Sequence, residues 1–224
     1  MALSCINGRM AGKFVTFEGG EGAGKSSQIR RLADQLTASG RTVTTTREPG
    51  GTATAESIRR LLLSGFAEQL GAEGEAILFA AARADHVERV IRPALRAGHW
   101  VLCDRFIDST RAYQGATGGV DDALLAALDR VAVGRTMPDL TIVLDVPVEV
   151  GLARAAERWA AAGENPDRFE RDDVVFHELR RQAFLQLAAR EPERCVVLDA
   201  SQAEEVVAKA VWQTVSSRLL DAAT

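Results

Sequence analysis

The chain carries, at positions 19–26, the run Gly19-Gly20-Glu21-Gly22-Ala23-Gly24-Lys25-Ser26, which matches G-x-x-x-x-G-K-[ST] in full. The residues before it, Lys13 to Glu18, read as a short strand, and Ser27 to Ser39 read as a helix with its apolar residues on one face. A strand, a glycine loop and a helix in this order form a phosphate cradle. The alternative, a glycine-rich turn that matches by chance, is disfavoured because both flanks fit as well.

Each residue type in this loop suits the binding of phosphate groups. Glycines let successive backbone N–H groups converge on phosphate oxygens, where a side chain would clash. The start of the following helix adds unpaired N–H groups and the positive end of its dipole. Lys25 can reach the β- and γ-phosphates of a nucleotide, and the hydroxyl of Ser26 can hold Mg2+. The loop therefore predicts a nucleoside triphosphate site.

Length and composition are those of one globular domain. The chain has 224 residues, of which 46% are hydrophobic, and we expect a single domain over 13–224 after a disordered extension at 1–12. A net charge of −4 argues against a nucleic-acid polymer as partner. Cys5, Cys103 and Cys195 are far apart and read as reduced core residues rather than a disulfide or metal set. Without an apolar run of membrane length or a signal peptide, the sequence predicts a cytoplasmic protein with no membrane contact.

Strand and helix patterns alternate along the chain. The predicted strands are 13–18, 41–46, 100–103, 140–146 and 195–198. One long helix is expected over 73–97, bent or interrupted at Pro93, and another helical piece over 109–114. Such alternation predicts an α/β fold, a parallel sheet of about five strands with helices on both faces. Ligands then bind beyond the carboxyl ends of the strands, where the polar residues of this chain cluster.

Further sequence motifs, taken together with the glycine loop, match the pattern of a known family. They are Arg47-Glu48-Pro49-Gly50-Gly51-Thr52, Phe79-Ala80-Ala81-Ala82-Arg83, Asp104-Arg105-Phe106, Ser109-Thr110-Arg111-Ala112-Tyr113-Gln114-Gly115 and Asp199-Ala200-Ser201-Gln202. In order and spacing, from about Lys13 to the last helix, the set resembles the thymidylate kinase (dTMP kinase) family of P-loop nucleoside monophosphate kinases. No single run except the glycine loop is specific.

The resemblance implies transfer of the γ-phosphoryl group of ATP to dTMP, with Mg2+, giving dTDP and ADP in the route to dTTP. It also implies a homodimer. The ATP contacts would be Gly19, Gly20, Glu21, Gly22, Ala23, Gly24, Lys25, Ser26, Ser27 and, on the adenine side, Gln202.

Asp104 and Arg105 follow a predicted strand, where a guanidinium can grip an acceptor phosphate through two parallel hydrogen bonds. Asp104 would bind Mg2+ through water or orient Arg105; the alternative is a simple ion pair at the strand end. Phe79 and Arg83 are four apart and share a helix face. Spacing alone favours a core phenylalanine and a surface arginine. The resemblance instead implies that Phe79 stacks on thymine and that Arg83 donates to its 4-carbonyl.

By the same resemblance, the ring of Tyr113 lies under the sugar and would obstruct a 2′-hydroxyl; the alternative is a buried tyrosine with a bonded hydroxyl. Ser109 and Gln114 are weaker candidates near the acceptor, and Arg47 is a candidate second contact to its phosphate. Glu21 would face the sugar 3′-hydroxyl or the metal shell.

A predicted lid over 154–171 carries several arginines. A charge-rich helix is usually a solvated face, but Glu21 and Ala23 leave the glycine loop without a cation for the transition state. The sequence resembles the branch of the family with arginines in the lid. Arg158 is the first candidate and Arg168 the second.

Two other functions stay open on the residues alone. One is a kinase for a different acceptor, such as a deoxynucleoside, because related enzymes also place Asp-Arg after a strand. The other is a GTP-dependent switch or nucleotide-binding regulator without turnover. The chain lacks the Asn-Lys-x-Asp run that specifies guanine, which counts against the switch.

Overall fold

The computed structural model describes residues 12–163 and 168–220, and five strands within them form one parallel sheet. The strands are β1 (Phe14–Glu18), β2 (Val43–Arg47), β3 (Trp100–Asp104), β4 (Leu140–Asp145) and β5 (Cys195–Asp199). Their order across the sheet is β2-β3-β1-β4-β5. The predicted fold class, a P-loop-type α/β sheet, is confirmed.

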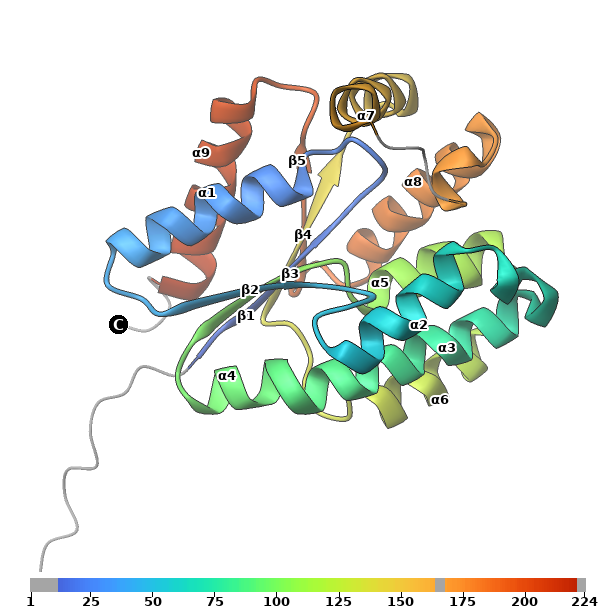
Figure 1. Cartoon of the computed structure of the whole chain (residues 1–224). Helices are drawn as coiled ribbons and strands as arrows, with labels where there is room; N and C mark the ends of the chain where they lie inside the picture. Colours follow the sequence, from blue (N-terminus) through green and yellow to red (C-terminus); the bar gives the residue numbers. More distant parts are fainter. Residues whose placement is uncertain (1–11, 164–167, 221–224) are drawn as a thin grey trace, which may run out of the picture.

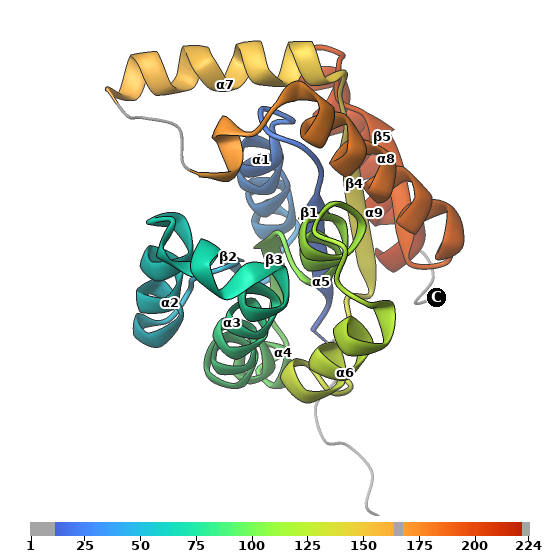
Figure 2. The same ribbon diagram turned by 90° about the vertical axis from the view of Figure 1, so that its right-hand side faces the viewer.

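Helices cover both faces of the sheet (Figure 1). On one face lie α1 (Lys25–Ala38) and α9 (Glu204–Val215), which pack on β1 through one apolar core. On the other face lie α3 (Gly71–His86), α4 (Arg92–Arg96) and α8 (Val174–Arg190). Turned by 90°, the molecule shows α2 (Ala53–Leu63) and α6 (Asp122–Ala132) on either side of α3 (Figure 2). The three central strands, β1, β3 and β4, are buried because both faces are covered, and their largely apolar sequences follow from this.

The carboxyl ends of the strands meet at one edge of the sheet. Arg47 stands beside Asp104, and Asp145 stands beside Asp199. From this edge the chain leaves β1 into the glycine loop, β2 into residues 48–52, and β3 into α5 (Ile107–Thr110). The polar runs of the sequence therefore converge at the edge where parallel α/β sheets bind their ligands.

The helix predicted over 73–97, bent or interrupted at Pro93, is present as an unbroken helical run with an irregular middle. It consists of α3 from Gly71 to His86, a π-helical stretch at Val87–Ile91, and α4. Pro93 stands near the start of α4, directly after the π-helical stretch. It lacks the N–H that would pair with the preceding turn, so the irregular stretch precedes the proline. The piece predicted over 109–114 is likewise one α-helical turn, α5, followed by a π-helical stretch at Arg111–Thr117.

Two predicted segments fall partly or wholly outside the described residues. Residues 1–11 of the expected extension are not among them, nor are 164–167 of the expected lid. The described part of the expected lid is the second half of α7 (Val148–Ala162), from Arg154 onward, with Gly163 and a short 3-10 turn at Phe169–Arg171. None of the helices in 12–163 and 168–220 is both long and apolar enough to cross a membrane.

Candidate active site

The glycine loop joins β1 to α1 and is packed against α7. Gly22 has a φ of 64°, and a Cβ there would lie 1.9 Å from the carbonyl oxygen of Gly151 in α7. Only glycine fits so close an approach. Lys25 is buried, and its Nζ donates to the carbonyl oxygens of Gly19 (3.1 Å) and Gly20 (2.9 Å). The lysine charge is thus held inside the loop, where nucleotide phosphates would lie.

Hollows run from the α9 side of the loop, past the loop itself, to a pocket beside α3. The first, the donor groove, has lining residues that include Gly22, Gly24, Ser27, Arg158 and Gln202. The second, the phosphate groove, shares with it Gly22, Ala23, Gly24, Ser27 and Arg158. The third, the acceptor pocket, has a volume of about 160 Å³ and shares Glu21, Glu48, Arg59 and Arg105 with the phosphate groove. A donor phosphate and an acceptor phosphate can therefore meet beside Glu21 and Arg105.

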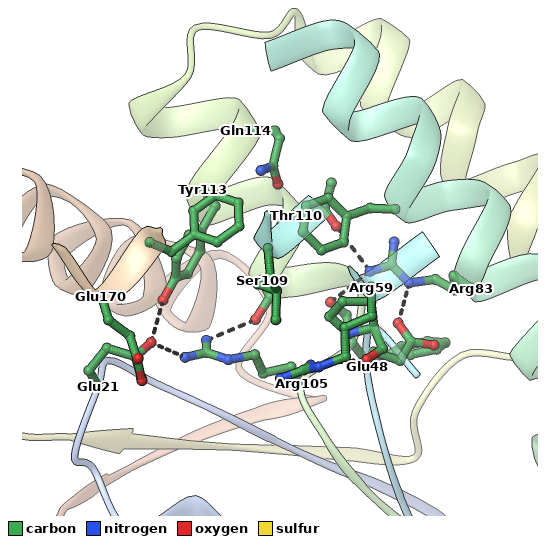
Figure 3. A pocket seen from close by; sticks show the side chains of 15 residues that line it. Glu21, Glu48, Arg59, Arg83, Arg105, Ser109, Thr110, Tyr113, Gln114 and Glu170 are labelled. Carbon is green, nitrogen blue, oxygen red and sulfur yellow. Dashed lines mark hydrogen bonds and ion pairs between the residues drawn. The ribbon is translucent and has the colours of Figure 1, made fainter. Parts of the chain in front are cut away.

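Arg105 is fixed at the junction of these hollows. It follows β3 with a φ of 68°, a left-handed conformation that is uncommon for residues other than glycine and is found most often at functional sites. Its guanidinium donates to Glu21 Oε1 (2.6 Å), to Ser109 Oγ (3.2 Å) and to the Gly19 carbonyl (3.2 Å), the first two of which are drawn in Figure 3. The hydroxyl of Tyr113 donates to the same Glu21 oxygen (3.1 Å).

The two glutamates near Arg105 have opposite electrostatics. Burial would raise the pKa of Glu21, but the charges of Arg105 and Lys25 outweigh it and lower that pKa to about 2. Glu18, at the end of β1, has its pKa raised to about 7 by burial and by the nearby charge of Asp108. Its carboxyl oxygens accept hydrogen bonds from Phe106 N (2.7 Å) and Ser109 Oγ (2.6 Å). Glu21 is therefore an ionised partner of Arg105, and Glu18 supports the turn that follows Arg105.

The acceptor pocket brings together residues predicted from two distant runs (Figure 3). Phe79 and Arg83 enter it from α3, and Ser109, Tyr113 and Gln114 enter it from the stretch that follows β3. Arg83 is 2% exposed. The surface position that helix spacing alone predicts for this arginine is therefore wrong. Its Nε donates to Glu48 Oε2 (2.7 Å). An aromatic face and a guanidinium in one pocket suit a flat ring that carries a carbonyl.

Ser26 and Asp104 form an oxygen pair at the edge of the phosphate groove. Ser26 Oγ donates to Asp104 Oδ2 at 2.7 Å, and both residues line that groove beside Lys25. A hydroxyl and a carboxylate are the hard oxygen donors that Mg2+ prefers. The two residues predicted as metal ligands therefore lie together and fit the ion.

The two candidate lid arginines lie in different places. Arg158, on α7, lines both the donor and the phosphate groove, and its guanidinium donates to Glu170 Oε1 (3.1 Å). Arg168 instead forms ion pairs with Glu68 and with the buried Glu75 of α3. Arg158 thus lies beside the glycine loop, whereas Arg168 attaches its segment to α3. The transition-state role predicted for these arginines stays a prediction.

The other predicted residues lie around these hollows. Ser27 and Gln202 line the donor groove. Gln114 lines the acceptor pocket and directs its amide to Glu75 (3.4 Å). Arg47 lines the phosphate groove but not the acceptor pocket, and its guanidinium donates to Glu56 (2.9 Å). Its predicted contact with the acceptor phosphate stays a prediction.

Several lining residues were missed from the sequence. Arg59 of α2 lines both the acceptor pocket and the phosphate groove. Phe169 stands near both Phe79 and Tyr113, with ring centroids 6.2 and 5.7 Å away. Arg154 donates to the carbonyls of residues 200 and 201 and so holds the loop of the donor groove. Arg154 and Phe169 fall inside the predicted lid, and that position was the sequence signal that could have identified them as lining residues. An arginine within a helix, such as Arg59, carries no such signal.

Comparison with known proteins agrees with this geometry. The sequence model described as thymidylate kinase matches residues 17–211. The chain belongs to the thymidylate kinase family. It is 57% identical over 211 residues to the thymidylate kinase of Bradyrhizobium sp. (strain ORS 278), covering 94% of this chain and 92% of the relative. It is 56% identical to that of Rhodopseudomonas palustris (strain ATCC BAA-98 / CGA009), covering 97% and 94%.

A solved structure extends the thymidylate kinase match to three dimensions. The crystal structure of thymidylate kinase from Ehrlichia chaffeensis is similar with a TM-score of 0.72 and 33% identity, covering 92% of this chain and 99% of that one. The family and the enzyme class predicted from the sequence, an ATP-dependent nucleoside monophosphate kinase, are confirmed.

Proposed function

We propose that this chain transfers the γ-phosphoryl group of ATP to dTMP, giving dTDP and ADP. The observation that carries the proposal is the junction at Glu21 and Arg105, where the groove of the glycine loop opens into the acceptor pocket. A phosphoryl group can pass directly between two bound nucleotides only if their phosphates meet, and these two hollows share their lining at one point.

Catalysis in this arrangement depends on position and charge. Phosphoryl transfer needs alignment and neutralisation of the developing charge more than covalent chemistry. Lys25 holds the donor phosphates, Arg105 holds the acceptor phosphate, and Arg158 of the lid neutralises charge on the group in transfer. A general base is unnecessary because the attacking phosphate oxygen is already ionised.

A magnesium ion belongs to the proposal. Ser26 and Asp104 would hold it, because their oxygens lie together beside Lys25. When bound, Mg2+ neutralises charge on the donor phosphates.

Recognition of the acceptor follows from the pocket lining. Phe79 offers a stacking face to the base, and Arg83 donates to a 4-carbonyl, which thymine has and cytosine lacks. The ring of Tyr113 packs 5.2 Å from the guanidinium of Arg105, next to the group that would hold the acceptor phosphate. This supports the position under the sugar that the family resemblance implies. The bulk of this ring excludes a 2′-hydroxyl.

A homodimer is also proposed. Phe66, Leu70 and Ile77 expose more than half of their surface, and exposed large apolar side chains close together in the chain offer area to a second copy. Sedimentation velocity measures the assembly state; a monomer at micromolar concentration contradicts this part of the proposal.

The test of the reaction is ADP release over a panel of acceptors and donors. We expect turnover with ATP and dTMP, weaker turnover with dUMP, and little with dCMP or thymidine. Lys25→Met should abolish it, because the lysine supplies charge to the phosphates. Lys209→Met, on an exposed part of α9, is the matched control and should keep it. Turnover with thymidine but not with dTMP would make the chain a deoxynucleoside kinase instead.

A further inference from the structure

Arg83 is the end of a row of polar side chains, of which only the far member, Thr46, is partly exposed. Its Nε donates to Glu48 Oε2 (2.7 Å), the other oxygen of Glu48 lies 2.9 Å from His86 Nδ1, and His86 Nε2 lies 2.7 Å from Thr46 Oγ1. The residues come from β2, the loop after it, and α3. Glu48 and His86 are 5% and 0% exposed, so solvent does not replace the two contacts of Glu48.

The chemistry of each contact fixes its direction. An ionised carboxylate only accepts, so both Arg83 Nε and His86 Nδ1 donate to Glu48. A hydroxyl both donates and accepts, so Thr46 satisfies His86 Nε2 whether or not that nitrogen carries a proton. Each oxygen of Glu48 is occupied, and its carboxylate plane is held from both sides. Rotation of Glu48 would break a buried, charge-assisted hydrogen bond, which is among the stronger kinds in proteins.

The backbone turn after β2 closes over this row. A Cβ on Gly51 would lie 2.6 Å from two ring atoms of His86 and 2.8 Å from Thr46 Oγ1. Gly51 also has a φ of 83°, which favours glycine. The turn therefore packs directly on the imidazole and the hydroxyl and leaves them no room to move.

Arg83 makes further contacts with the protein, including an ion pair of its NH1 with Asp129 Oδ1 at 3.9 Å. Its NH2 donates to the Phe106 carbonyl (3.1 Å) and to Thr110 Oγ1 (2.9 Å), and Figure 3 shows it between Thr110 and Glu48. With Nε held by Glu48 and NH2 held by the segment after β3, the plane of the guanidinium is determined. A hydrogen bond to a base reads its partner only when the donor direction is fixed in this way.

We propose that Glu48, His86 and Thr46 form a positioning relay that fixes the Arg83 guanidinium and thereby sets the preference for a 4-carbonyl over a 4-amino pyrimidine. The inference rests on the proposed function, in which Arg83 faces the base. A purely structural role is the weaker explanation, because an apolar cluster of similar volume is often as stable as a buried ion pair. Thr46 and His86 line none of the three hollows, whereas Glu48 lines the acceptor pocket and the phosphate groove. Thr46 and His86 can therefore influence the base only through Glu48 and Arg83, which is why Thr46 is the residue to change.

The decisive variant is Thr46→Val, which removes only the hydroxyl at the far end of the relay. Its matched control is Thr44→Val, because Thr44 lies two residues earlier on the same strand and contacts another imidazole, His99 Nδ1, at 3.1 Å. Both changes remove one strand hydroxyl from one histidine. Only Thr46 leads to Glu48 and Arg83, so a difference between the variants isolates the relay from general effects on β2.

The measurement is kcat/KM for dTMP and dCMP. We expect Thr46→Val to lower the dTMP-to-dCMP ratio about fivefold, the equivalent of one ordinary hydrogen bond. Glu48→Gln should lower it about tenfold or more, because an amide cannot accept from both donors. Thr44→Val and the conservative Thr46→Ser should keep the native ratio. The melting temperatures of the two valine variants should match, so stability does not account for the difference.

A second readout is independent of turnover. In nitrogen-15 spectra of the native enzyme, the His86 Nδ1 proton should exchange slowly and couple to its nitrogen. Glu48→Gln should broaden or remove that signal.

The outcomes separate the relay from the proposed function. If the native enzyme shows no preference for dTMP over dCMP, base reading by Arg83 fails and the relay fails with it. If the native preference is present but Thr46→Val keeps the ratio within twofold, or Thr44→Val lowers it equally, the relay is overturned and the proposed function stands. Thr46→Val is a mild change and decides the matter even if Glu48→Gln does not fold.

Discussion

Glu18 offers a direct test of the electrostatics beneath the acceptor site. Its side chain is fully buried at the end of β1, and its pKa is raised from 4.5 to about 7 by burial and by the charge of Asp108. The change to make is Glu18→Gln, which keeps the shape and cannot ionise. The amide oxygen can still accept from Phe106 N, and the amide nitrogen can donate to Ser109 Oγ, as the protonated acid would. The variant therefore mimics the protonated form at every pH.

The size of the effect follows from the pKa. Between pH 4.5 and about 7 the folded protein holds a proton on Glu18 that the unfolded chain has lost. The stabilisation by this proton is complete below pH 4.5 and is lost as the pH rises through about 7. One pKa unit is worth about 1.4 kcal/mol, so the loss between pH 5 and pH 8 is about 2–3 kcal/mol. Glu18→Gln has no such proton to lose.

The assay is urea unfolding of both proteins at several values between pH 5 and pH 8. The free energy of unfolding of the variant, relative to the native protein, should rise by about 2–3 kcal/mol across this range. Glu157→Gln, on an exposed part of α7, controls for the loss of one acidic side chain. Native and Glu18→Gln profiles that run parallel would refute the reasoning, because Glu18 would then titrate alike in both states.

Two further predictions concern groups around the junction of the hollows. Arg158→Ala should lower kcat about tenfold or more with little change in the KM for dTMP, because a lid cation acts on the transition state. Arg168→Ala should mainly raise that KM, since it detaches residues 168–171 from α3. If steady-state kinetics show the reverse pattern, Arg168 is the transition-state cation and Arg158 is not. Tyr113→Ala should raise activity on the ribose form of the acceptor relative to the deoxyribose form. Tyr113→Phe loses only the bond to Glu21 and should keep the preference for deoxyribose. If both variants have the same preference, Tyr113 serves only packing.

Much of the fold could be predicted because its signals are local. The glycine loop with its flanking strand and helix occupies adjacent residues, and β3 and β4 are continuous apolar runs. Because the carboxyl ends of parallel strands lie at one edge of the sheet, the polar motifs that follow the strands can be predicted to lie together there. The irregular stretch after His86 was not predictable in this way. A π-helical turn keeps an apolar, helix-forming sequence and differs only in how its backbone hydrogen bonds are paired.

The site was harder to predict where its residues are held by distant partners. Arg83 shares a helix face with Phe79, and a charged residue in a helix is most often exposed. It is buried here because Glu48, 35 positions earlier, supplies a carboxylate. The hydrophobic periodicity of the sequence does not indicate that pairing, because the pair forms only when the turn after β2 folds against α3.

The same argument separates the two lid arginines. Both stand in charged stretches of similar composition, and the sequence could rank them only by resemblance. Their difference lies in their partners: Glu75 is buried on α3 and draws Arg168 toward that helix, while α7 packs its backbone on Gly22 and places Arg158 over the loop. Gly151 opposite Gly22 makes that close packing possible. Gly151 thus lets α7 approach the loop and places Arg158 beside the phosphate groove. Under the proposed function, we expect a side chain at position 151 to move Arg158 away from the donor phosphates and to lower kcat.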